Sequence, residues 1–200
     1  MKFAGFTIIA GMLTAPVPAI AQSPLGATDT VRAFSDALIA TMRDGPALGF
    51  SGRSARLAPV IERSFDLDLA TRLSIGPEWS RLSASDQTAL TGAIRRMTVA
   101  EYARNFARWN GEAILVDPRA TSRGNDALVR TTLTRRSGDP VVLAYRLRQA
   151  GGKWRIIDVL FNGSVSQLAT RRADYARILN SGGAPALVRH LDKTTANAAR

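Results

Sequence analysis

Asp158 is the residue whose type and surroundings most strongly suggest a chemical role. It interrupts an apolar run, Ile156-Ile157-Asp158-Val159-Leu160, and a buried carboxylate is costly unless hydrogen bonds or a charge partner compensate it. We favour a structural polar clamp, in which Asp158 binds the following Gly163-Ser164 turn or an arginine such as Arg171, and we include Ser166 among the clamp residues. The alternative is a polar group at the mouth of a ligand pocket.

The other candidates for catalysis or metal binding are weak. His190 is the only histidine, it stands beside Arg189, and it is far in sequence from any serine–acid pair. Asp66 and Asp68 lie two residues apart without a histidine nearby to complete a set of metal ligands, so Asp66 is better explained as a helix cap. The sequence has no cysteine, no glycine-rich phosphate loop and no G-x-S-x-G motif. We therefore predict neither a catalytic site, nor a metal, nor a cofactor.

The N-terminus has the layout of a secretory signal peptide. Lys2 precedes a short apolar run from Phe3 to Leu13, and Ala19-Ile20-Ala21 gives the small-x-small pattern of a cleavage site. The run is shorter than the roughly 20 residues needed to span a bilayer, although a retained anchor is the alternative. We predict a signal peptide over 1–21, and a single periplasmic domain over 22–200.

The chain is strongly basic, and the charge comes almost entirely from arginine. It has 27 Lys+Arg against 16 Asp+Glu, for a formal net charge of +11. Attraction to an anionic membrane surface is one interpretation, and a solvated surface rich in arginine is the other. Nucleic acid is not expected as a partner, because the arginines are scattered and do not form a stripe with aromatic residues.

Hydrophobic periodicity divides the chain into helices, then strands, then helices. Apolar residues at spacings of three and four change to alternation near residue 112 and return to helical spacing near residue 164. A break at Gly45-Pro46 and a loop reaching Ser54 are expected within the first helical part. The predicted helices are 29–42, 57–65, 67–73, 77–82, 83–109, 164–180 and 185–195, and the predicted strands are 112–116, 127–135, 141–149 and 154–161.

This order predicts an α+β domain, with helices packed around a curved four-stranded antiparallel sheet that encloses an apolar pocket. The strands alternate between an apolar and a wet face, as in Val141, Leu143 and Tyr145 against Arg146 and Arg148. The large apolar residues exceed what a closed layer needs, so we assign a pocket wall to them. The predicted lining is Phe65, Leu69, Ile75, Trp79, Met97, Tyr102, Phe106, Trp109, Val129, Leu133, Leu143, Tyr145 and Leu147.

Several motifs, in order along most of the chain, give a family resemblance. They are Leu57-Ala58-Pro59-Val60-Ile61, Phe65-Asp66, Gly76-Pro77-Glu78-Trp79, Ser83-Ala84-Ser85-Asp86-Gln87, Tyr102-Ala103, Trp154-Arg155-Ile156-Ile157-Asp158-Val159, Gly163-Ser164-Val165-Ser166 and Arg171. With them the chain resembles the MlaC-type periplasmic lipid-binding proteins, which are auxiliary components of an ABC transport system linked to toluene tolerance. The stretches 57–66 and 102–111 look closer to the hopanoid-associated branch of that family.

The resemblance implies a function in lipid transport. Such a protein carries a phospholipid or a hopanoid between an inner-membrane ABC transporter complex and an outer-membrane lipoprotein–porin complex, with transient membrane contact. Two alternatives are kept. A ketosteroid-isomerase-like enzyme would use Asp158 or Asp66 as a buried base, and a periplasmic adaptor would dock partner proteins without binding lipid.

Overall fold

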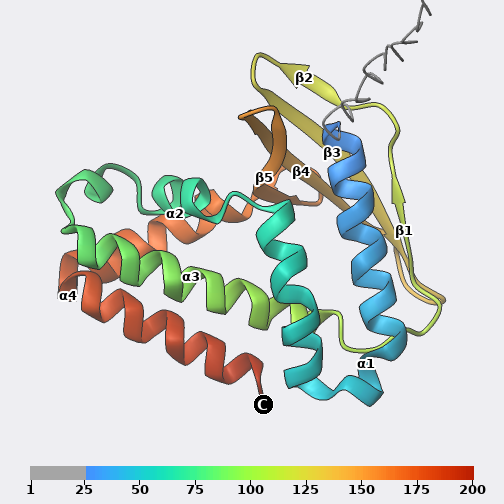
Figure 1. Ribbon diagram of the computed structural model, residues 1–200, viewed down its shortest axis with the longest axis horizontal. Helices are drawn as coiled ribbons and strands as arrows, with labels where there is room; N and C mark the ends of the chain where they lie inside the picture. Colours follow the sequence, from blue (N-terminus) through green and yellow to red (C-terminus); the bar gives the residue numbers. More distant parts are fainter. Residues whose placement is uncertain (1–25) are drawn as a thin grey trace, which may run out of the picture.

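A computed structural model describes residues 26–200, so the predicted signal peptide, 1–21, lies outside the described residues. Four helices, α1 to α4, surround one face of a twisted antiparallel sheet (Figure 1). The predicted α+β class, with helices around an antiparallel sheet, is confirmed. Within residues 26–200, no helix combines the length and the hydropathy that crossing a bilayer requires.

Helix α1, Ala27–Ser64, is a helical hairpin, and its bend differs from the one predicted. The chain stays helical through Gly45-Pro46 and bends at Gly49, whose backbone is at φ 62°. Gly45 serves close packing instead, because a Cβ there would lie 2.0 Å from the carbonyl oxygen of Ala107. The prediction of a break at 45–46 and of a loop up to Ser54 is therefore wrong.

Helices α2 and α3 begin at side-chain caps, provided by Asp66 and Ser83. Helix α2, Leu67–Ile75, begins after Asp66, whose carboxylate accepts the backbone N–H of Leu69 at 2.9 Å, as expected of a helix cap. The 3₁₀ helix η1, Gly76–Arg81, leads to α3, Ala84–Asn105. Helix α3 ends before the predicted Trp109, because the chain turns there and the Trp109 indole donates a hydrogen bond to the carbonyl of Glu112 at 2.9 Å.

Among residues 26–200 the sheet has six strands, not the four predicted. They are β1 Ala113–Val116, β2 Thr121–Arg123, β3 Asp126–Thr134, β4 Val141–Ala150, β5 Lys153–Phe161 and β6 Val165–Ser166, in the order β1-β3-β4-β5-β6, with β2 also paired to β3. Strands β1, β3, β4 and β5 match the predicted runs. Strands β2 and β6 are three and two residues long, too short for alternation to reveal them.

Helix α4, Gln167–Ala198, begins three residues after the predicted start because β6 occupies part of that stretch, and it bends at Gly183, where φ is 67°. Two cores result. One lies between α1 and the sheet and contains Phe34, Val129 and Leu147. The other lies among α2, α3 and α4 and contains Ile75 and Met97. The candidate site lies in the space between these two cores.

Candidate functional site

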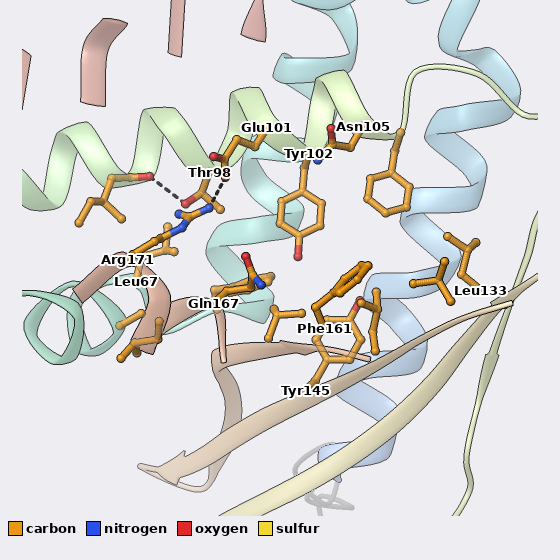
Figure 2. Close-up of a pocket in the computed structure, with 18 of the residues that line it drawn as sticks. Leu67, Thr98, Glu101, Tyr102, Asn105, Leu133, Tyr145, Phe161, Gln167 and Arg171 are labelled. Atoms are coloured by element: carbon orange, nitrogen blue, oxygen red, sulfur yellow. Dashed lines mark hydrogen bonds and ion pairs between the residues drawn. The ribbon is translucent and has the colours of Figure 1, made fainter. Parts of the chain in front are cut away.

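A cavity of about 740 Å³ separates the sheet from α3. Strands β3, β4 and β5 form its floor, α3 forms its roof, and α2 and the first turns of α4 close one end (Figure 2). This volume lies within the range of roughly 300–1,000 Å³ that small-molecule sites in proteins occupy. The opposite end is open, because the lining residues there, Asn105, Arg108, Asn110, Arg135 and Phe161, are exposed.

The floor of the cavity follows from strand alternation. Leu143 pairs with Phe161, and Tyr145 pairs with Val159, so all four side chains share the inner face of the sheet. The register then shifts after Arg146, which leaves Ile157 as an extra residue in β5, and Ile157 also lines the cavity. The bulge thus adds one apolar side chain to the floor.

An aromatic cluster forms one wall. Phe34 is fully buried in α1, and its ring makes edge-on contacts with Phe65, Tyr102 and Tyr145, with centroids 5.2, 5.3 and 6.1 Å away. Phe106 stacks on Tyr102 at 5.7 Å. Burial raises the pKa of the Tyr102 and Tyr145 hydroxyls, so both stay neutral and leave this wall uncharged.

One ion pair lies in the cavity wall. Arg171 of α4 donates a hydrogen bond to the carboxylate of Glu101 of α3 at 2.6 Å, and the pair joins the two helices near the closed end (Figure 2). Burial by itself would lower the pKa of Arg171, but the Glu101 carboxylate and the Tyr175 hydroxyl outweigh it and the pKa is raised. Arg171 is therefore a cation paired within the wall, and its partner is Glu101, not Asp158.

Asp158 lies outside the cavity and holds the start of α4. Its carboxylate accepts the hydroxyl of Ser166 at 2.5 Å and the backbone N–H of Leu168 at 3.0 Å. The Ser166 hydroxyl in turn accepts the backbone N–H of Ala169 at 2.9 Å. Two groups near the N-terminus of α4 are satisfied in this way. Neither Asp158 nor Asp66 lines the cavity, so neither is placed as the base of an isomerase would be.

Replacing Asp158 with alanine should destabilise the domain. The Leu168 N–H and the Ser166 hydroxyl would lose their acceptor, at a cost of about 1–3 kcal/mol, and the melting temperature should fall by roughly 2–4 °C for each kcal/mol. Asp158→Asn keeps an acceptor for Leu168 and should lose less; circular dichroism melting compares the two. An unchanged melting temperature together with lost lipid binding would instead assign Asp158 to ligand contact.

The structure brings six of the thirteen predicted lining residues to the cavity and places seven elsewhere. The six are Phe65, Tyr102, Phe106, Leu133, Leu143 and Tyr145. Of the others, Val129 and Leu147 lie in the core beneath α1, and Ile75, Trp79 and Met97 lie in or against the helical core. Leu69 is half-buried on α2, and Trp109 is 39% exposed. Alternation identified the inner face of the sheet, but α1 covers one half of that face and the cavity covers the other.

Sequence reasoning missed much of the polar lining. Glu101, Asn105 and Gln167 reach the cavity from helices, and no local pattern distinguishes them from surface residues. Val141 and Val159 also line it, and both could have been found, because they alternate with Leu143 and Phe161 on their strands.

The fold and this cavity together define an α+β domain with an apolar binding chamber. The family described as MlaC protein matches residues 32–193 of the chain. Among solved structures, the chain is similar to a phospholipid-binding protein from Ralstonia solanacearum in complex with a phospholipid, with a TM-score of 0.73 and 24% identity over 88% of this chain and 100% of that one. No curated protein matches the chain.

The protein belongs to the MlaC family. This confirms the resemblance seen in its motifs and the expectation of a lipid-binding family that is not enzymatic. Assignment to the hopanoid-associated branch stays a prediction.

Proposed function

We propose that this protein binds a membrane lipid and carries it through the periplasm, with the hydrocarbon chains in the cavity between α3 and the sheet. The observation that carries the proposal is the cavity itself: about 740 Å³ of space walled by Phe65, Tyr102, Phe106, Leu143 and other apolar side chains. The family relationship supports it, as does the phospholipid bound to the similar protein of Ralstonia solanacearum.

The energetics of lipid transfer explain why such a cavity is needed. A lipid with two acyl chains has on the order of 30 methylene groups, and each costs about 0.8 kcal/mol to expose to water. The total, roughly 20 kcal/mol or more, prevents unaided movement between membranes. A carrier must shelter the chains about as well as the bilayer does, and hardly better, because it must also release them.

The lining residues divide by the part of the lipid that they would contact. We assign the acyl chains to the floor and the aromatic wall, where Leu133, Leu143 and Tyr145 face Tyr102 and Phe106. The polar part of the lipid would lie at the open end. A glycerophospholipid would place two acyl chains in this space, and a hopanoid would place a rigid polycyclic body there.

The family relationship supports a transport role. We propose that the signal peptide is cleaved after Ala21, and that the mature chain works in the periplasm. There it would exchange lipid with an inner-membrane ABC transporter complex and an outer-membrane lipoprotein–porin complex.

Extraction of the purified protein tests lipid binding directly. The full chain, 1–200, is expressed so that it is exported; the protein is then purified without detergent and extracted with organic solvent, and the extract is analysed by mass spectrometry. We expect lipid in a stoichiometric amount, and its mass distinguishes glycerophospholipid from hopanoid. A clean extract would favour the adaptor, and turnover of a small ketone without bound lipid would favour the isomerase.

A further inference from the structure

The exposed large hydrophobic residues of the described chain gather around the open end of the cavity. Among residues 26–200 these residues, with their exposed fractions, are Trp109 (39%), Leu115 (61%), Val142 (38%), Phe161 (45%) and Val165 (51%). Phe161 lines the cavity itself, and Trp109 lies between Arg108 and Asn110, which also line it. A cluster of this kind on an otherwise polar surface marks an interaction site.

The strand register places several apolar residues of the sheet near one another. Val165 pairs with Phe161, and a Cβ on Gly163, in the turn between them, would lie 3.7 Å from Val142. On the outer face, Thr132 pairs with Val142 on one side and with Leu115 on the other. Exposed apolar residues therefore lie on both faces of the sheet near its tip, with Thr132 between Val142 and Leu115 on the outer face.

Four arginines lie near Trp109 and the open end of the cavity. Arg108 and Arg135 line the cavity at its open end. The guanidinium of Arg43 lies 5.3 Å from the centre of the Trp109 ring, and Arg136 lies over Gly111, where a Cβ would come within 2.7 Å of its Nε. All four are exposed, and none forms an ion pair within 4 Å with a carboxylate of residues 26–200.

We propose that this surface, the mouth patch, docks the open end of the cavity onto an anionic bilayer. The mouth patch comprises Trp109, Leu115, Val142, Phe161, Val165, Arg43, Arg108, Arg135 and Arg136. The inference rests on the proposed function, since it gives the cavity a direct route to membrane lipid. In Figure 2, Phe161 lies beneath Tyr102, with Arg171 on one side and Leu133 on the other, so an acyl chain passing over Phe161 would meet apolar side chains.

Charge and shape select a bilayer as the occupant. Unpaired guanidinium groups complement lipid phosphates, and each contributes about 1 kcal/mol at an anionic membrane surface. Tryptophan is enriched at the membrane interface, where its ring lies among the headgroups, and the Trp109 indole N–H is already satisfied by Glu112. A small cluster of apolar side chains of this size suits shallow, reversible insertion.

Vesicle flotation of the lipid-loaded mature protein at physiological salt tests the proposal. The vesicles contain equal parts phosphatidylglycerol and phosphatidylcholine, or phosphatidylcholine alone. We expect the protein to float with the anionic vesicles only. Arg43→Gln/Arg136→Gln should weaken the partition by about 30-fold, and Leu115→Ser/Val165→Ser should also weaken it. These four residues do not line the cavity.

The matched control removes the same charge from the other end of the molecule. Arg72 is exposed on α2, and Arg172 is exposed on α4 against Gly76. Arg72→Gln/Arg172→Gln should bind vesicles nearly as the parent does, because salt screens charges beyond about 8 Å. An equal loss in this control would indicate general adsorption of a basic protein and would overturn the docking proposal.

Solvent extraction of the same samples separates this inference from the proposed function. Bound lipid without flotation would overturn membrane docking and leave the carrier function intact, with a protein as the partner of the mouth patch. Flotation that depends on the mouth patch, from a protein that yields no lipid, would support docking and contradict the carrier function.

Discussion

Leu143→Asp is expected to abolish lipid binding at neutral pH. Leu143 lies in the middle of the cavity floor, paired with Phe161 and with Thr131. In the empty cavity an aspartate there can be hydrated, but bound acyl chains would remove that water. The carboxylate must then be protonated, and because its ordinary pKa is about 3.9, protonation at pH 7 costs about 4 kcal/mol. Affinity should therefore fall about a thousandfold.

The same substitution makes binding depend on pH. As the pH falls toward 4, the carboxyl group takes up its proton at little cost, and the retained lipid should increase. Thr132→Asp is the matched control, because Thr132 is one strand away with its side chain on the outer face. The measurement is lipid per protein after purification at each pH. If Leu143→Asp retains its full lipid content at pH 7, the inner face of the sheet does not contact the lipid.

Phe34→Ala is expected to produce the largest loss of stability. Phe34 is fully buried and makes edge-on contacts with three aromatic side chains of the cavity wall. Truncating a buried phenylalanine costs about 3–5 kcal/mol, which corresponds to a fall in melting temperature of roughly 10 °C for a domain of this size. Phe65, Tyr102 and Tyr145 would also lose their shared contact with the Phe34 ring. Lipid binding should therefore weaken even at temperatures well below the melting temperature.

Phe50→Ala provides the comparison, because Phe50 lies partly buried at the edge of the same core. It should lower the melting temperature by much less. Calorimetry of both variants after delipidation measures the protein alone. Equal melting temperatures for the two variants would mean that Phe34 does not hold the wall together.

The spacing of apolar residues predicted the main helices and strands, because each of these elements buries one face and exposes the other. Phe34 belongs to an apolar stripe at helical spacing, and Leu143 and Tyr145 alternate on β4. The bend in α1 was misplaced because Gly45 was interpreted as a breaker. Its contact with Ala107 is a tertiary approach that no local pattern of Gly45-Pro46 reveals.

The candidate site was only partly predictable for a related reason. Alternation shows that Leu133 and Leu147 share a face of the sheet, but not that α1 covers Leu147 while Leu133 meets open space. The partner of Arg171 could not be derived either, since Glu101 stands seventy residues earlier and meets it only through the packing of α3 on α4. Asp158 was recognised because an acidic residue in an apolar strand requires a local partner.

Lipid carriage by this protein requires hydrocarbon to occupy the space between α3 and the sheet. A crystal structure of the protein purified with its natural ligand tests this most directly. We predict elongated electron density for acyl chains or a polycyclic lipid along Leu143, Tyr145 and Tyr102, with its polar end toward Arg108 and Arg135. Side chains of the protein filling that space, with no lipid in the crystals, would contradict it.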